Sequence, residues 1–217
     1  MVDRGIIDLT PERGLIFRIT HRNNLPWILD HGVHCRNSPV RDPGFVPIGL
    51  TDLIEKRNRQ AVPEPPRGVL SDYVPFYFTP LSPMLLNIKT GRNGVIRRAN
   101  EEIVILLTSL HIVARDGLPF LFTGGHASAS GAEFFRDLAD LDVIDWGILR
   151  AKDFARDPED PRKQERYMAE ALVHQVLPVQ SLRAIGCSCA ATQDYAKTLV
   201  DQRNLRLPIA LRPSWYF

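Results

Sequence analysis

The sequence lacks the features that mark most membrane, secreted and metal-binding proteins. No stretch approaches the roughly 20 uninterrupted apolar residues that a membrane helix requires, and the N-terminal segment has acidic charges but no apolar run of secretory type. The three cysteines, at positions 35, 187 and 189, are an odd number, and the C-x-C pair has no second pair and no nearby histidines. We therefore expect a cytoplasmic protein without membrane contact, disulfide framework or metal site.

Common catalytic motifs are also missing. There is no P-loop, no G-x-G-x-x-G after a strand, no H-E-x-x-H and no G-x-S-x-G. The absence of these motifs argues against the standard cofactor-binding and hydrolase functions. The formal net charge of +2 does not by itself indicate nucleic-acid binding. Basic residues do gather within 56–67, 89–98 and 150–166, where they also suit a solvated surface.

Length and composition suit one domain, because 217 residues with 44% hydrophobic content can bury one substantial core. We predict a loose lead-in over residues 1–13 and a single domain over residues 14–217. Strand-like segments are 15–20, 71–80, 101–110, 117–123, 181–188 and 206–213. Helices are predicted at 23–31, capped by Asn23 or Asn24 and stopped by Gly32, and at 52–60 and 132–150. The class is α+β, with short strands and long connections.

Four polar residues stand out, and each has two interpretations. Glu170 lies in the apolar segment YMAEALVHQVLP, which fits a helix or a strand. An exposed glutamate there would form an ordinary salt bridge, whereas a buried one would need a partner or a purpose. Arg18, in its hydrophobic strand, could form an ion pair with a carboxylate at the sheet edge. Tyr73, like Tyr77, suits a core, and His126 in the glycine-rich loop TGGHASASG suits either solvent or a function.

Taken together, the segments resemble the DarT family of DNA ADP-ribosyltransferases over nearly all of residues 15–217. The matching blocks are FRITHRNNLPWILDHGVHC, EKRNRQAVP, GVLSDYVPFYFTPLSPMLLNI, EEIVIL, GLPFLFT, ERYMAEALVHQVLP and SWYF. The most specific block runs from Gly68 to Met84. The resemblance implies the ADP-ribosyltransferase fold, a split and curved antiparallel β core with surrounding helices and an NAD cleft. It also implies that Glu170 starts a strand, which resolves the ambiguous segment.

The resemblance assigns roles to individual residues. Glu170 and Arg57 are the expected catalytic residues, with Arg57 on a loop that folds over NAD. The expected NAD contacts are Arg57 together with Arg18, Ile19, Thr20, His21 and Asn24. Many relatives carry His where this chain has Arg18, so its hydrogen bonds are expected to differ. The expected DNA contacts are Tyr73, Met84 and His126, the last in a substrate-recognition loop from about Phe122 to Glu170.

The function implied by the resemblance is that of a toxin. It transfers ADP-ribose from NAD, a co-substrate, to ring N3 of thymidine in single-stranded DNA and releases nicotinamide. Pairing occupies N3 in a duplex, so the base must be unpaired to react. The expected partners are single-stranded DNA and a DarG-type macrodomain antitoxin, and the chain is expected to be a monomer.

Two alternatives stay open. The same fold could modify guanine in DNA or a protein side chain. A non-catalytic nucleic-acid-binding module, in which Glu170 and Arg57 are only structural, is the second.

Overall fold

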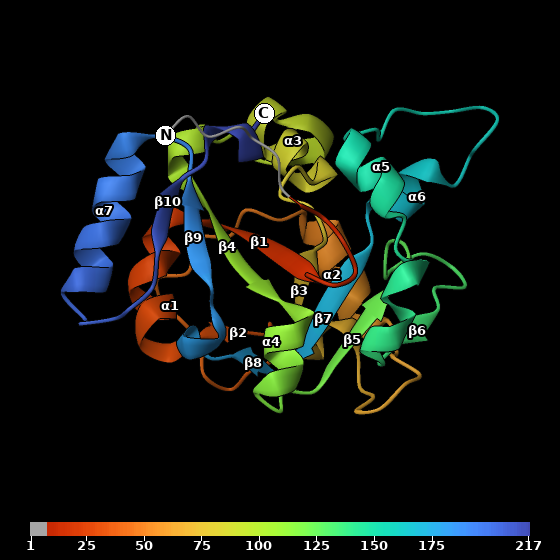
Figure 1. Ribbon diagram of the computed structural model, residues 1–217, viewed down its shortest axis with the longest axis horizontal. Helices are drawn as coiled ribbons and strands as arrows, with labels where there is room; N and C mark the ends of the chain where they lie inside the picture. Colours follow the sequence, from red (N-terminus) through yellow and green to blue (C-terminus); the bar gives the residue numbers. More distant parts are fainter. Residues whose placement is uncertain (1–7) are drawn as a thin grey trace.

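A computed structural model describes residues 8–217, whose centre is a mainly antiparallel sheet of eight strands (Figure 1). The strand order is β10-β9-β4-β1-β3-β7-β5-β6, and within this sheet β9 and β10 run parallel. The bounds are β1 Leu15–His21, β3 Tyr73–Tyr77, β4 Ile103–Ser109, β5 Phe120–Thr123, β6 Phe134–Phe135, β7 Glu170–His174, β9 Ala184–Cys187 and β10 Ile209–Leu211. A separate antiparallel pair joins β2, Val33–His34, to β8, Val176–Leu177.

Helices surround the twisted sheet (Figure 1). Their bounds are α1 Leu25–His31, α2 Thr51–Arg59, α3 Pro83–Thr90, α4 Leu110–Arg115, α5 Trp146–Ala151, α6 Lys163–Tyr167 and α7 Ala190–Asp201. Short 3-10 turns join several of these elements. Across residues 8–217, none of the helices has the length and apolar character needed to cross a bilayer.

The sheet splits between β1 and β3. Strand β1 pairs with β4 along its whole length, from Leu15 opposite Ser109 to His21 opposite Ile103. Within the described chain it meets β3 only where Phe17 lies opposite Tyr77. Beyond that point no further pairing joins the two strands within the described residues, and the split core implied by the family resemblance is confirmed.

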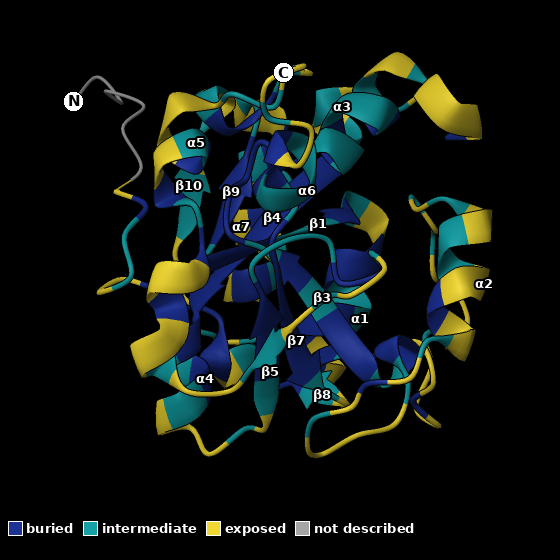
Figure 2. Ribbon diagram, turned by 90° about the vertical axis from the view of Figure 1, so that its right-hand side faces the viewer, coloured by how far each residue is buried: buried dark blue, intermediate teal, exposed yellow. Residues whose placement is uncertain are grey.

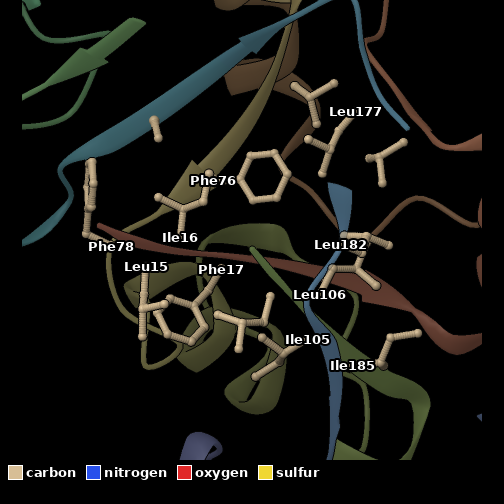
Figure 3. Packing of buried hydrophobic residues seen from close by; sticks show 14 of the residues in the cluster. Leu15, Ile16, Phe17, Phe76, Phe78, Ile105, Leu106, Leu177, Leu182 and Ile185 are labelled. Atoms are coloured by element: carbon tan, nitrogen blue, oxygen red, sulfur yellow. The ribbon is translucent and has the colours of Figure 1, made fainter. Parts of the chain in front are cut away.

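The main hydrophobic core lies against β1, β3 and β4. Every residue of β4 is buried, as its continuous apolar sequence indicates. Ile16, Phe76 and Ile105 belong to this core, which Figure 3 shows from close by. The ring of Phe17 meets that of Trp215 edge to face at a centroid distance of 5.3 Å. The C-terminal aromatic block is therefore part of the core.

A smaller hydrophobic cluster covers the opposite face of β3 and β7. Its buried members are Val62, Leu70, Tyr73, Leu121, Ala127 and Leu172. Because side chains alternate along a strand, Glu170 projects on the same face as Leu172, while Ala171 and Val173 enter the main core. Figure 2 shows β3 and β7 as mostly buried strands and α2 with an exposed outer face.

Most predicted strands are confirmed, but the long helix predicted over 132–150 is wrong. The segment contains the strand β6, a 3-10 turn at Leu138–Val143 and the helix α5. Asp137 and Asp145 explain the interruption, since their carboxylates accept hydrogen bonds from the backbone N–H groups of Ala139 and Ile148 and so cap two separate turns. The helices α3, α4 and α7 were not anticipated from the sequence.

The predictions for the N-terminal region need two corrections. Residues 1–7 of the predicted lead-in lie outside the described residues. The remainder is not loose, because Leu9 is buried and its carbonyl accepts a hydrogen bond from Arg150 Nη1 at 2.9 Å. Asn24 precedes α1 as predicted, but its side chain makes no capping hydrogen bond and binds elsewhere.

Candidate active site

Glu170 is the first residue of β7, with Tyr77 of β3 opposite it on one side and Thr123 of β5 on the other. The residue is only 2% exposed. Its Oε2 accepts a hydrogen bond from Arg57 Nη1 at 2.8 Å, and its Oε1 accepts one from the backbone N–H of Ala127 at 3.1 Å. The carboxylate is therefore buried and fixed in direction, unlike a solvated surface glutamate.

Arg57 is buried although it belongs to a strongly polar helix. It is the buried residue of α2, whose other residues are exposed or half-buried. One amino group of the guanidinium, Nη1, binds Glu170, while the other, Nη2, is enclosed and has no hydrogen-bond partner within residues 8–217. An enclosed donor without a partner is costly, so Nη2 is available to a ligand acceptor.

Arg18 lies at the split and brings a second cation to the site. Its Nη1 donates to the carbonyl of Pro75 at 2.9 Å and so spans the opening between β1 and β3. Loss of hydration, together with the charge of Arg57, lowers the pKa of Arg18 to about 10. Burial raises the pKa of Tyr77, and the charge of Glu170 acts in the same direction. Two guanidiniums, one carboxylate and a neutral phenol thus face one another.

The remaining first-strand residues divide between the two faces. Thr20 shares the Arg18 face and accepts a hydrogen bond from Asn24 Nδ2 at 3.0 Å. Asn24 also donates to the carbonyl of Val46 and accepts from its N–H, at 3.0 and 2.8 Å. The amide of Asn24 therefore holds the irregular segment before α2 against β1.

Ile19 and His21 project on the opposite face of β1 from Arg18. Ile19 packs against the main core. His21 Nδ1 accepts a hydrogen bond from the N–H of Asn23, and its Nε2 lies 3.5 Å from Glu102. Strand alternation turns these two side chains away from Arg57, and the expected contact of Ile19 and His21 with NAD stays a prediction.

The glycine-rich loop after β5 approaches Glu170 and is held by α2. His126 Nδ1 lies 3.4 Å from Glu170 Oε1. Lys56 Nζ donates to the carbonyl of Ser128 at 2.8 Å, and Gln60 Nε2 donates to that of Ala127 at 2.9 Å. The part of the predicted recognition loop that borders Glu170 is thus 123–131, while β6, α5 and α6 occupy much of the remainder.

Tyr73 lies apart from this cluster. Tyr73 sits at the other end of β3, opposite His174, where it is 1% exposed and donates its hydroxyl to the carbonyl of Arg67 at 2.7 Å. Met84, in the first turn of α3, is half-buried against the main core. Direct DNA contact by Tyr73 therefore needs correction, because the side chain is enclosed by the smaller cluster.

Tyr77 is a site residue that the sequence analysis assigned to the core. The sequence did contain one signal that could have found Tyr77. This residue is four positions from Tyr73 in a strand, so both side chains must share a face. What the sequence could not provide was the register that sets Tyr77 opposite Glu170. Lys56 and Gln60 were missed for the same reason, because their contacts depend on how α2 meets the distant loop.

Comparison with known proteins identifies the family. A family model described as ssDNA thymidine ADP-ribosyltransferase, DarT, matches residues 17–217. This chain belongs to the DarT family. It is 49% identical over 209 residues to a DNA ADP-ribosyl transferase of Escherichia coli O127:H6, covering 96% of each chain.

Solved DarT structures share the fold. The DarT of Thermus sp. 2.9 in complex with ADP-ribosylated ssDNA superposes with a TM-score of 0.87 at 36% identity, covering 95% of this chain and 98% of that one. The same DarT in complex with NAD⁺ gives a TM-score of 0.82 at 35% identity, covering 95% of this chain and 99% of that one. The expected ADP-ribosyltransferase fold is confirmed, and the chain is an NAD-dependent DNA ADP-ribosyltransferase with NAD as its co-substrate.

The residues at the split fit NAD. Arg18 and Arg57 outnumber the single carboxylate of Glu170, so the cluster carries excess positive charge suited to a pyrophosphate. The free Nη2 of Arg57 supplies a donor for such an anion. Within residues 8–217, no group of three or more His, Cys, Asp or Glu side chains is arranged to hold a metal ion.

Proposed function

We propose that this protein transfers ADP-ribose from NAD to ring N3 of thymidine in single-stranded DNA and releases nicotinamide. The observation that carries the proposal is the buried carboxylate of Glu170, fixed between Arg57 and the N–H of Ala127 where the sheet splits. The DarT of Thermus sp. 2.9, whose structure contains ADP-ribosylated ssDNA, supports a DNA acceptor for this fold.

Glu170 acts on the ribose of NAD. As the bond between C1′ and the nicotinamide nitrogen breaks, its electron pair goes to the departing ring, and positive charge develops on the ribose. An enclosed carboxylate stabilises this charge more than it stabilises intact NAD, which is the condition for a faster reaction. The same carboxylate can accept a hydrogen bond from a ribose hydroxyl and so orient C1′.

Arg57 binds anions in this mechanism. Its guanidinium stays protonated at ordinary pH, so it does not itself remove a proton. Its Nη2 donates to the phosphates of NAD, and its charge stabilises the thymine anion left when the N3 proton departs. The new bond joins thymine N3 to ribose C1′, and the products are the modified base, nicotinamide and a proton.

The acceptor must be unpaired, because N3 carries the central hydrogen bond of a thymine–adenine pair. Cations beside the site suit a single strand, since Lys56 and Arg59 of α2 are exposed. His126 borders Glu170, which supports a contact between this residue and the acceptor base.

We propose further that the protein is a toxin restrained by a DarG-type macrodomain antitoxin. A Thermosipho africanus relative, 24% identical over 203 residues, is a fusion of a DNA ADP-ribosyl transferase with a DNA ADP-ribosyl glycohydrolase, which supports a partner that reverses the modification. We propose that the active unit is a monomer. The substrates NAD and DNA meet in the cytoplasm, where we expect the reaction.

Labelled NAD and a thymine-containing oligonucleotide test the proposal directly. Label should enter the single strand and be nearly absent when the strand is annealed to its complement. Mass spectrometry of the nucleosides should show ADP-ribose on thymidine N3. Label on guanine or on protein would establish the alternative acceptors, and no label with DNA binding intact would establish the non-catalytic module.

Growth of an expressing host tests the toxin role. The wild-type chain should be hard to maintain without an antitoxin, whereas Glu170→Ala at equal protein level should be tolerated. Equal toxicity of the two chains would contradict a toxic effect that depends on transfer.

A further inference from the structure

The loop that follows α3 carries one of the basic clusters of the sequence, and the mechanism above gives it no role. We call residues 89–98 the basic loop. Its cations are Lys89, Arg92, Arg97 and Arg98. Arg92 and Arg97 are exposed, and Ile96 is 68% exposed, more than any other large hydrophobic side chain among residues 8–217. The loop therefore presents positive charge and an apolar side chain to solvent.

The backbone of the basic loop is fixed by contacts at both of its arms. The N–H of Arg98 donates to the carbonyl of Ile88 at 3.0 Å, which closes the base of the loop. Gly91 has a φ of 73°, and a Cβ placed there would lie 3.4 Å from the Cβ of Arg97, so the two arms lie side by side. Val95 is buried in the main core. The exposed cations are thus presented by an anchored backbone, which lowers the entropy cost of binding a partner.

The positive charge of the basic loop is largely left over by the protein itself. Within residues 8–217, Lys89, Arg92 and Arg97 form no ion pair. Glu102 of the following turn pairs with Arg98 at 3.2 Å and lies 3.5 Å from His21 Nε2. Unpaired cations at fixed positions suit an anionic partner, and a nucleic-acid backbone supplies phosphates at regular intervals.

Helix α3 connects the candidate active site with the basic loop. The chain leaves β3 at Tyr77, opposite Glu170, and reaches Leu81, whose carbonyl accepts a hydrogen bond from the hydroxyl of Tyr167 at 3.2 Å. The start of α3 therefore adjoins the segment that leads into β7. With eight residues, α3 is about 12 Å long, a distance that a few nucleotides of a single strand can span.

We propose that the basic loop binds the phosphates of the DNA strand a few nucleotides away from the acceptor thymine. The proposal rests on the proposed transfer to single-stranded DNA, because the strand must continue from the acceptor base to reach the loop. Lys89, Arg92 and Arg97 contact phosphates whatever the base sequence, and Ile96 packs against an unstacked base. The loop thereby adds affinity for longer strands without changing the chemistry at Glu170.

The dependence of transfer on strand length measures this contribution. A short oligonucleotide carries one thymine with a single adenine on each side, and two longer ones extend it by about six adenines on the 5′ or on the 3′ side. With saturating labelled NAD, extension on at least one side should raise kcat/KM for the wild-type chain roughly 10-fold, as two phosphate contacts imply.

Arg92→Gln combined with Arg97→Gln removes two exposed charges that have no ion-pair partner in the described chain, so the fold and the rate on the short strand should stay unchanged. The double variant should lose the gain from extension. Fluorescence anisotropy of the long strand should show a slope of log affinity against log salt that is smaller by about 1.4, the value for two lost contacts. Ile96→Ala should weaken binding of the long strand and leave the salt slope unchanged.

The matched control is Arg183→Gln combined with Arg206→Gln. Both arginines are exposed and precede β9 and β10, at the edge of the sheet order away from β7. This variant removes the same charge and should keep both the gain from extension and the salt slope of the wild type.

The outcomes separate the basic loop from the function on which it rests. A wild-type chain that gains nothing from extension on either side would overturn the proposal, and so would a gain that persists in the Arg92→Gln, Arg97→Gln variant. An acidic protein as the occupant of the loop would leave strand binding and salt slope of that variant unchanged, which would also overturn the proposal. Absence of label on every strand, with long-strand binding still weakened in that variant, would instead remove the proposed function and leave the DNA-binding loop in place.

Discussion

The two ends of the β3–β7 strand pair differ in how far their polar side chains are satisfied by hydrogen bonds. At one end, Tyr77 lies opposite Glu170 beside Arg57, and at the other, Tyr73 lies opposite His174 beside Asp72. A cavity of about 550 Å³ lies at the Tyr73 end. Cavity volume alone would therefore select the end opposite to Glu170.

Hydrogen bonding distinguishes the two ends. Asp72 Oδ1 accepts from Asn37 Nδ2 at 2.8 Å and its Oδ2 from the N–H of Val69 at 2.7 Å, while the Tyr73 hydroxyl binds a backbone carbonyl. At the other end, Arg57 keeps an enclosed donor without a partner in the described chain. Satisfied polar groups stabilise a fold, whereas an unsatisfied, charged one retains capacity for a ligand.

Replacing a carboxylate by an amide at each end should give the largest contrast. Glu170→Gln removes the charge that faces the ribose, so transfer should fall roughly 100-fold or more while folding survives. Asp72→Asn changes the other end by the same chemical step and should leave transfer unchanged. Single-turnover rates with labelled NAD, alongside thermal unfolding, measure both. A folded Glu170→Gln chain that transfers at the wild-type rate would misplace the catalytic centre.

Reducing the number of hydrogen-bond donors at position 57 should give the next largest effect on transfer. Arg57→Lys keeps the charge but loses the fork that contacts Glu170 and a second acceptor together, so kcat/KM should fall about 10-fold, with weaker NAD binding. Arg67→Lys, at the Tyr73 end, is the control and should bind NAD normally. Calorimetric titration with NAD resolves the two, and equal affinities would show that Arg57 does not contact the phosphates.

Removing one hydroxyl at each end should separate stability from activity. Tyr73→Phe loses the hydrogen bond to Arg67, so the free energy of unfolding should fall by about 1 kcal/mol with transfer unchanged. Tyr77→Phe alters a phenol facing Arg18, Arg57 and Glu170 and should change the transfer rate more than the stability. Denaturant unfolding and initial rates test the pair, and the reverse pattern would contradict the distinction.

Many of the strands could be predicted from residue patterns alone. The site residues could be predicted only from the family resemblance. The continuous apolar run of β4 and the β-branched and aromatic residues of β1 predicted strands, because both signals depend only on neighbours in sequence. The helix predicted over 132–150 was wrong because 3- and 4-residue spacings also occur in short capped turns.

Contacts distant in sequence could not be read from local patterns. The pair Arg57–Glu170 spans 113 positions, and the contact of Gln60 with Ala127 spans 67. Residues such as Tyr77, Lys56 and Gln60 gain their roles only when the sheet register and the position of α2 are known.

The smallest expected effect concerns pH and the Tyr73 end. Burial lowers the pKa of His174 below its usual 6.5, although the charge of Asp72 opposes the shift. Since the fold favours the neutral imidazole, unfolding takes up a proton as the pH falls below about 6.5, and stability should decrease there and be fully present above that pH. The difference in unfolding free energy between pH 7.5 and pH 5 should be smaller for His174→Gln. An equal difference would show that His174 does not titrate with folding.

Amide hydrogen exchange with and without saturating NAD tests whether NAD binds at the Glu170 end. We expect slower exchange in α2 and at the N–H of Ala127, whose partner Glu170 would be held by the ligand, with no change at 34–40 and 174–176 around the cavity of the Tyr73 end. Protection confined to 34–40 and 174–176, with α2 and Ala127 unchanged, would show that NAD binds at the Tyr73 end instead.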